Sequence, residues 1–379
     1  MQAIEVVLAL LVVVTALAGL ARRFGVPDPV LLVVAGLGIG FVPGMPHPEL
    51  EPDLVFLLFL PPILYGAAFF TSIRDLRANL RPILLLSVGL VLFSMVAIAT
   101  VTKALVPDLP WAAAFALGAI VAPPDAVAAT GVFRRLGVPR RMVTILEGES
   151  LVNDATALVA LRTAVVALGG TFSVVDATVS FFGVAVGGIV VGLVVGRVSG
   201  ILTKRIQDPV LVTVISLLVP AISYLPAETL GVSGVLSVVT AGLMAGRLAP
   251  RDLNSAQRVS GTAAWEIVLF LINGIVFVLI GLQLPLILEE LEQRAIELVG
   301  IAVAVSATAI IARYVWVYPA TYLPHLLSAR IRETERRPSP RNIAIVGWAG
   351  MRGVVSLAAA LSLPLDFPGR ALILFLTLP

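Results

Sequence analysis

Long apolar runs, separated by short polar connections, make up almost the whole chain. A helix that crosses a bilayer needs about 20 apolar residues, within a range of ~17–25. The runs therefore predict an all-α polytopic membrane protein of about thirteen spanning helices, numbered here in chain order: 3–21, 29–43, 53–70, 82–105, 110–130, 142–168, 172–200, 209–225, 231–247, 262–288, 295–324, 342–363 and 369–379. The last run is too short to span, so we expect a truncated final helix.

Basic residues collect in every second connection, after the odd-numbered segments. These connections contain Arg22 and Arg23; Arg74, Arg77 and Arg81; Arg134, Arg135, Arg140 and Arg141; Lys204 and Arg205; Arg247, Arg251 and Arg258; and Arg330, Arg332, Arg336, Arg337 and Arg341. The positive-inside rule places such connections in the cytoplasm. We therefore predict a multi-pass protein of the cell (inner) membrane with its N-terminus outside. The first run is then a spanning helix, because a cleaved signal peptide has its basic residues before the apolar core.

Composition narrows the class of protein further. Of the 379 residues, 59% are hydrophobic and 13% are charged, whereas soluble domains carry about 25% charged residues. So much apolar surface needs lipid as its solvent. The lack of cysteine excludes disulfides and thiol chemistry, and two histidines near segment ends do not suggest a zinc site. The basic residues form no single patch, so nothing indicates nucleic-acid binding.

Segment six contains the strongest candidate site. Asp154 lies about twelve residues from the cytoplasmic end of this segment, or ~18 Å deep at 1.5 Å per residue. Ser150 precedes Asp154 by one helical turn, and Glu149 precedes Asn153 by one turn, so the pairs occupy adjacent strips of the helix. Carboxylate, amide and hydroxyl oxygens suit a hard cation such as sodium.

A charged carboxylate at that depth is costly unless something compensates it, so we expect Asp154 to bind either a proton or a cation. Such alternating occupancy is the minimum that antiport requires. The alternative is a structural carboxylate held by hydrogen bonds between helices. We favour the functional role, because acidic residues inside a membrane commonly mark transport pathways.

Segments five and twelve are each interrupted, and each carries one mid-helix charge. The residues concerned are Pro123, Pro124 and Asp125 in segment five, and Gly350, Arg352 and Gly353 in segment twelve. Proline removes a backbone donor and glycine weakens a helix, and transporters use such breaks at midplane sites. The opposite directions and opposite charges of the two segments predict an inverted repeat: repeat one 1–170, connector helix 172–200 and repeat two 209–379.

Other features favour structural interpretations. Glu266 and Arg313 are further mid-segment charges, which we place at helix interfaces in preference to an access path. Small residues recur at four-residue spacing in segment seven and predict a helix-packing face: Gly188, Gly192, Gly196 and Gly200.

Four motifs occur in order along the chain: Phe-Leu-Pro-Pro-Ile-Leu (59–64), Ala-Pro-Pro-Asp-Ala-Val-Ala (122–128), Leu-Glu-Gly-Glu-Ser-Leu-Val-Asn-Asp (146–154) and Gly-Met-Arg-Gly-Val-Val-Ser (350–356). Together they resemble the sodium/proton exchanger family, in the branch of NhaP-like and eukaryotic exchangers among the cation:proton antiporters. The resemblance covers nearly the whole chain. It implies a homodimer in which a mobile core slides, in the elevator manner, against a scaffold of helices 1–3 and 8–10. It also implies that Glu149 and Arg352 form a structural ion pair, which agrees with the pairing that we expect for a mid-helix arginine.

The same resemblance implies roles for the site residues. Asp154 is the shared carrier of the proton and of the transported sodium ion, with Ser150 as a hydroxyl ligand of the sodium. Asn153 marks the electroneutral branch, and Asp125 lies where the broken helices cross. Many relatives carry threonine before this aspartate, whereas this chain has Pro124, so a side-chain ligand is not expected there.

We therefore expect antiport of a monovalent cation, sodium, against one proton, without a cofactor. The exchange is electroneutral if Asp154 alone titrates, and a titrating Asp125 would break that stoichiometry. Potassium/proton exchange by the same site is an alternative. Alternatives from other classes are a passive channel and an intramembrane aspartyl-type enzyme that uses Asp125 and Asp154 as a dyad. The expected partners are monovalent cations, the lipid bilayer and a second copy of the chain.

Overall fold

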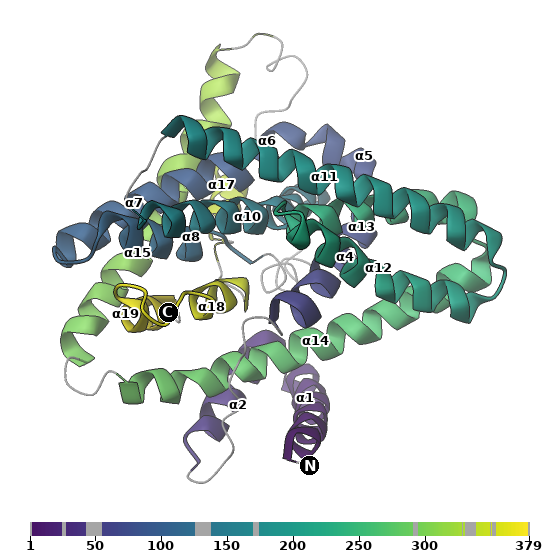
Figure 1. Cartoon of the computed structure of the whole chain (residues 1–379), viewed down its shortest axis with the longest axis horizontal. Helices are drawn as coiled ribbons and strands as arrows, with labels where there is room; N and C mark the ends of the chain where they lie inside the picture. Colours follow the sequence, from purple (N-terminus) through teal and green to yellow (C-terminus); the bar gives the residue numbers. More distant parts are fainter. Residues whose placement is uncertain are drawn as a thin grey trace. The chain divides into compact units, whose positions relative to one another are not determined.

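Helices account for all the regular structure in the described part of the chain (Figure 1). The computed structural model describes residues 2–24, 28–42, 55–125, 138–169, 174–290, 295–327, 329, 339–348, 350 and 354–377, and no β-strand occurs in these ranges. The predicted all-α class is confirmed. Within these ranges six helices are long and apolar enough to cross a membrane, and four other apolar helices are shorter. The total of about thirteen spans and the inverted repeat stay predictions.

The chain divides into two compact units. Unit 1 comprises Met1–Ser72 and Gly183–Gln293, and unit 2 comprises Ile73–Phe182 and Arg294–Pro379. The units do not follow the two predicted repeats, because each unit takes residues from both. Unit 1 contains predicted segments one to three and eight to ten, the segments that the resemblance groups as a scaffold. Movement of one unit against the other stays a prediction.

The described part of unit 1 contains eight helical elements, of which α11 begins in unit 2. They are α1 (Gln2–Phe24), α2 (Asp28–Gly40), η1 (Val55–Phe59), α4 (Leu60–Phe70), α11 (Val174–Arg205), α12 (Pro209–Thr229), α13 (Gly234–Asp252) and α14 (Ser255–Glu290). Local chemistry sets some of these boundaries. The Asp208 carboxylate accepts a hydrogen bond of 2.7 Å from the Val210 backbone N–H, and Pro209 occupies the first helical position. Both features favour the start of a helix.

Glycines allow the helices of unit 1 to approach one another closely. A Cβ atom at Gly192 of α11 would collide with the Ser237 carbonyl of α13, and one at Gly188 would collide with the Ser233 carbonyl. The predicted small-residue face of segment seven is therefore confirmed as the surface that packs on α13. In α13 itself, Gly246 is in similar contact with the Phe69 carbonyl of α4.

Unit 2 contains the remaining described helices and the first turns of α11. They are α5 (Ile73–Ala78), α6 (Leu80–Leu84), the π-helix η2 (Leu85–Leu90), α7 (Val91–Leu105), α8 (Trp111–Val121), α10 (Arg140–Ala167), α15 (Ala295–Leu327), α17 (Pro340–Trp348), α18 (Val354–Leu361) and α19 (Arg370–Thr377). The elements α6, η2 and α7 form one apolar span, Leu80–Leu105. Helix α10 packs against α6, η2, α7 and α8, so it lies at the centre of this unit.

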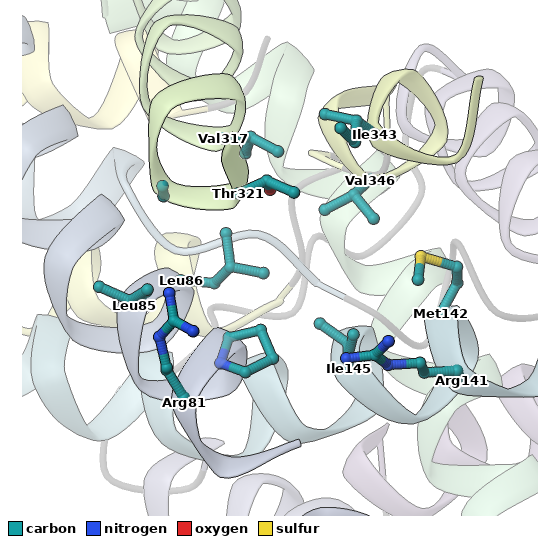
Figure 2. A pocket seen from close by; sticks show the side chains of 12 residues that line it. Arg81, Leu85, Leu86, Arg141, Met142, Ile145, Val317, Thr321, Ile343 and Val346 are labelled. Atoms are coloured by element: carbon teal, nitrogen blue, oxygen red, sulfur yellow. The ribbon is translucent and has the colours of Figure 1, made fainter. Parts of the chain in front are cut away.

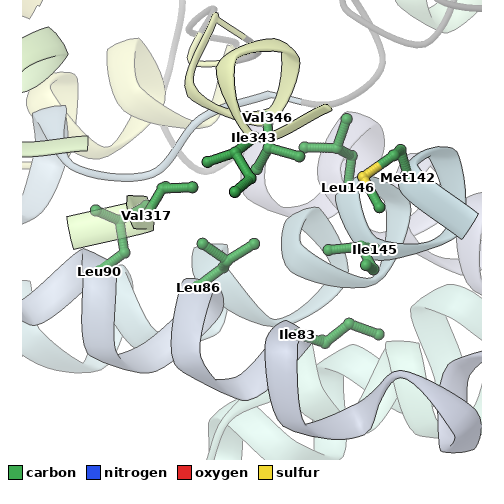
Figure 3. Packing of buried hydrophobic residues seen from close by; sticks show 9 residues of the cluster. All are labelled: Ile83, Leu86, Leu90, Met142, Ile145, Leu146, Val317, Ile343 and Val346. Atoms are coloured by element: carbon green, nitrogen blue, oxygen red, sulfur yellow. The ribbon is translucent and has the colours of Figure 1, made fainter. Parts of the chain in front are cut away.

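A hydrophobic cluster holds one end of α10 in place (Figure 3). It joins α6 and η2, α10, α15 and α17 through Ile83, Leu86, Leu90, Met142, Ile145, Leu146, Val317, Ile343 and Val346. Gly148 of α10 leaves room for the Ile83 side chain of α6, because a Cβ atom there would lie 2.5 Å from its Cδ1. The turn of α10 that follows this cluster begins the candidate site.

Candidate ion-binding site

Helix α10 holds the predicted site residues in the interior of unit 2. It runs without a break from Arg140 to Ala167, a stretch rich in leucine, alanine and valine with few residues that oppose a helix. Asp154 lies ~21 Å along the helix axis from Arg140 at 1.5 Å per residue. Its side chain is 7% exposed, and the Asn153 side chain is 0% exposed. Ser150, one turn before Asp154, is half-buried.

The interruption of segment five lies directly against this part of α10. Helix α8 ends at Val121, and Pro123, Pro124 and Asp125 are not helical. The Nδ2 group of Asn153 donates a hydrogen bond of 2.7 Å to the Pro124 carbonyl. A carbonyl beyond a helix end lacks its helical donor, and leaving it unpaired in the interior would be costly. Asn153 therefore ties the broken segment to α10.

The amide oxygen of Asn153, Oδ1, lacks the hydrogen bond that a buried polar atom usually has, because it is buried without a hydrogen-bond partner among the described residues. A buried acceptor without a partner costs about 1–3 kcal/mol, so it favours a bound cation or water. The Asp154 carboxylate interacts electrostatically with Asp125, which is half-buried. Amide and carboxylate oxygens therefore gather at one place, and they are ligands for a hard cation.

Glu149 forms a buried ion pair with Arg313, an arginine that was not predicted as its partner. Arg313 of α15 donates two hydrogen bonds to the carboxylate, from Nη1 to Oε1 at 2.6 Å and from Nη2 to Oε2 at 3.0 Å. The Arg313 Nε donates a third, of 3.0 Å, to the Val346 carbonyl of α17. The Glu149 and Arg313 side chains are 1% and 6% exposed. Arg352, the predicted partner, lies outside the described residues, so its pairing with Glu149 stays a prediction.

Parts of segment twelve also reach this region. It forms two helices, α17 and α18, and Gly350 between them is not helical, while Gly353 lies outside the described residues. Gly350 lies beside the ion pair, because a Cβ atom there would be 3.0 Å from the Arg313 Cδ. A small cavity joins α8, α10 and α18, and its lining includes Pro123, Leu158 and Ser356. Segments five, six and twelve, which contain three of the four motifs, therefore meet in unit 2.

Sequence reasoning missed the contribution of Arg313. It treated this residue as a helix-interface charge, although a buried arginine requires an acidic partner as much as Arg352 does. Glu149 is the acid that meets this requirement. Among the described residues, no group of three or more histidine, cysteine or acidic side chains could hold a resident metal. Glu266 belongs to α14 in unit 1, where it is exposed.

These features define a class of protein. A multi-pass helical chain with a buried carboxylate, a free amide oxygen and an interrupted helix at the same depth is built as a secondary ion transporter. The model of the transmembrane sodium/hydrogen exchanger family matches residues 8–378. The chain belongs to this family, which confirms the resemblance, and the family is one of transporters.

Several relatives agree with this assignment. The chain is 37% identical to an uncharacterized Na⁺/H⁺ exchanger of Mycobacterium tuberculosis, over 98% of this chain and 70% of that protein. It is 34% identical to a sodium, potassium, lithium and rubidium/H⁺ antiporter of Bacillus pumilus, over 98% of this chain and 58% of that protein. A Na⁺/H⁺ antiporter of Aphanothece halophytica is also 34% identical, over 91% and 64% respectively.

The fold has a solved counterpart. The structure of the sodium proton antiporter MjNhaP1 from Methanocaldococcus jannaschii matches with a TM-score of 0.77 at 22% sequence identity. The match covers 100% of this chain and 93% of that chain. At this identity the likeness shows the fold.

Proposed function

We propose that the chain exchanges sodium for a proton and that Asp154 carries each in turn. The observation that carries the proposal is the buried Asp154 beside an Asn153 amide oxygen that has no protein partner among the described residues. A sodium ion held there neutralises the carboxylate and gives the amide oxygen a partner. A proton on Asp154 neutralises the same charge in the sodium-free form. Ser150 and Asp125, on the same two segments, supply further oxygen ligands.

The proposed stoichiometry is one sodium ion for one proton, without net charge movement. Asn153 does not titrate, and its Nδ2 group is engaged with the Pro124 carbonyl. Glu149 is compensated by Arg313, so it adds no variable charge to the cycle. With Asp154 as the one exchanging group, each crossing carries the same charge whether the site holds sodium or a proton.

Potassium is the second candidate for the cation. The Bacillus pumilus relative carries potassium, lithium and rubidium in its name as well as sodium. Discrimination among these ions depends on the number and spacing of the coordinating oxygens. A site with an amide, a hydroxyl and two carboxylates on two different segments has oxygens whose spacing adjusts to ions of different size.

The proposed transport cycle is of the elevator type. Every described site residue belongs to unit 2, and unit 1 contains α1, α2, α12, α13 and α14. Unit 2 moves with its ion, and unit 1 is the scaffold at which two copies of the chain associate as a homodimer. The orientation with the N-terminus outside the cell membrane follows from the arginine-rich connections.

The test is a proton-flux assay in proteoliposomes with a pH-sensitive dye and pulses of sodium, potassium or lithium. Asp154→Asn removes the carrier, whereas Asp108→Asn makes the same change at an exposed position of unit 2. We expect cation-driven proton movement in the wild type and in Asp108→Asn, and none in Asp154→Asn. Equal movement in Asp154→Asn would overturn the assignment of the carrier. The absence of movement in folded wild type with every cation would overturn antiport.

Electroneutrality has its own measurement. The same vesicles are clamped with potassium and valinomycin at different membrane potentials, and sodium-driven proton flux is compared. We expect rates that do not change with potential, because each crossing carries the same charge. Rates that rise or fall steadily with potential would refute the one-to-one stoichiometry while leaving antiport intact.

A further inference from the structure

Several arginines lie together in unit 2, on α5 and α6 and at the start of α10, where the apolar spans begin. Arg74 and Arg77 of α5 are exposed, and Arg81 of α6 is half-buried. Two more arginines begin α10, where Arg140 pairs with Asp75 at 3.1 Å and the Arg141 Nε donates to the Asn79 Oδ1 at 2.9 Å. Asp75 is the only acidic residue in the sequence stretches 73–84 and 138–146. This region therefore carries a strong excess of positive charge.

An open apolar groove begins at these arginines and runs away from them. It is lined by Arg77, Ala78, Leu80, Arg81, Leu84, Leu85, Val88 and Gly89. Leu80 and Leu84 are 45% and 44% exposed. Leu92 and Val96 continue the row at the same four-residue spacing, with 36% and 49% exposed. From Leu80 to Val96 the row is ~24 Å long, which exceeds the ~15 Å depth of one hydrocarbon leaflet.

The helical wall of this groove is held in place by a contact with α15. The π-helix η2 widens the span here, and the Trp316 Nε1 of α15 donates a hydrogen bond of 2.9 Å to the Leu85 carbonyl. Gly89 permits the approach, because a Cβ atom there would lie 2.5 Å from the Trp316 ring. The groove is therefore a built surface, held against α15 by a specific hydrogen bond.

The same wall borders the interior of unit 2 on its other side. Arg81 and Leu85 also line a second pocket, together with Arg141, Met142 and Ile145 of α10 (Figure 2). One helical turn of α6 and η2 thus separates the groove from the helix that carries Asp154. The groove wall, made of α6 and η2, packs directly on α10.

We propose that this groove binds an anionic phospholipid, with the phosphate at Arg77 and Arg81 and one acyl chain along the leucine row. Guanidinium groups bind phosphate by paired, charge-assisted hydrogen bonds. Basic pockets at the cytoplasmic ends of spanning helices select anionic head groups. A zwitterionic phospholipid brings its own ammonium group to a site that is already positive. The apolar row adds a requirement for an acyl chain, which free phosphate lacks.

The leaflet follows from the proposed orientation of the chain, which places these arginines on the cytoplasmic side. Binding itself does not depend on the proposed exchange activity. Because the groove wall packs on α10, we expect the bound lipid to stabilise unit 2 against thermal unfolding.

The test measures lipid binding to the purified full chain in detergent. Phosphatidylglycerol and phosphatidylcholine with identical acyl chains are compared by native mass spectrometry and by thermal stabilisation. The variant Arg77→Gln/Arg81→Gln removes the two groove charges, and Arg247→Gln/Arg251→Gln removes two exposed arginines of unit 1 as the matched control. We expect the wild type and the control to prefer phosphatidylglycerol, and the groove variant to bind it on the order of tenfold more weakly.

Two further arms keep the test decisive. The single variant Arg77→Gln changes one exposed side chain, and it replaces the double variant if that protein unfolds in detergent. Leu84→Asn keeps both charges but interrupts the leucine row, and we expect it to weaken binding of long-chain phosphatidylglycerol. Equal affinity for the two lipids in the wild type, or unchanged affinity in the groove variants, would overturn the proposal. Displacement of the lipid by equimolar inorganic phosphate would show an anion site without lipid selectivity and would also overturn it.

Discussion

Replacing Arg313 with methionine removes the guanidinium that holds both carboxylate oxygens of Glu149. Two charge-assisted hydrogen bonds of 2.6 and 3.0 Å are lost, together with the bond from Nε to the Val346 carbonyl. Because Glu149 is 1% exposed, water does not replace the lost partner. Breaking a buried pair from one side costs about 3–5 kcal/mol. We therefore expect Arg313→Met to lower the free energy of unfolding by that amount.

A double-mutant cycle separates this charge effect from lost packing. In Glu149→Gln/Arg313→Met no uncompensated charge remains, and exchanging a buried ion pair for neutral side chains is often close to neutral. We expect the double variant to be more stable than Arg313→Met alone, with a coupling energy of about 2 kcal/mol or more. Arg205→Met, at an exposed position of α11, is the matched control and should change stability by less than about 0.5 kcal/mol.

The assay is reversible denaturant unfolding of the four proteins in detergent micelles, followed by tryptophan fluorescence. The decisive comparison is Arg313→Met against the double variant. If both variants lose the same free energy of unfolding relative to the wild type, or if the double variant is the less stable, the buried charge of Glu149 does not need Arg313 as its partner. The reasoning from the buried pair would then be refuted.

Three further outcomes follow from the geometry. Asn153→Ala removes the group that donates to the Pro124 carbonyl, and it also removes the amide oxygen that lacks a partner among the described residues. The KM for sodium in the flux assay should therefore rise about tenfold or more, which is a loss of ~1.4 kcal/mol or more in binding free energy. An unchanged KM would contradict the proposed role of Asn153 as a ligand. Gly192→Val places a Cβ atom against the backbone of α13 and should destabilise the protein by about 1–3 kcal/mol, whereas Gly183→Val, with nothing within 4 Å, should have little effect in the same unfolding assay. If sodium and protons compete for Asp154, the KM for sodium should rise as the pH falls, and flux measured across a pH series should show no such rise if the two bind at separate groups.

Spanning segments were the most predictable part of this protein. The run 142–168 corresponds to α10 at Arg140–Ala167, and the run 209–225 corresponds to α12 at Pro209–Thr229. A helix in lipid must satisfy its own backbone, so a long apolar run has few other conformations available. The interruption at Pro123 and Pro124 was predictable for the same local reason, because proline lacks the donor that a continuing helix needs.

Details that depend on neighbouring helices were not predictable. The run 82–105 gave no sign of the π-helix at Leu85–Leu90, whose Leu85 carbonyl is paired by Trp316, 231 residues further along the chain. The division into two units was also not visible as a change in composition, because both units are made of similar apolar helices. Only the resemblance had grouped segments one to three with segments eight to ten.

The partner of Glu149 illustrates the difference between what the sequence determines and what the tertiary structure determines. Reading the chain alone identified Glu149, Asn153 and Asp154 as polar groups buried in a spanning helix, because the cost of burying each can be assessed residue by residue. It did not show that Arg313 reaches Glu149, since Arg313 and Arg352 are equivalent as mid-segment charges. Helix packing brings Arg313 to Glu149, although 164 residues separate the two in the sequence. An ion pair requires two side chains to meet at hydrogen-bond distance, and the three-dimensional arrangement of α10, α15 and α17 decides that meeting.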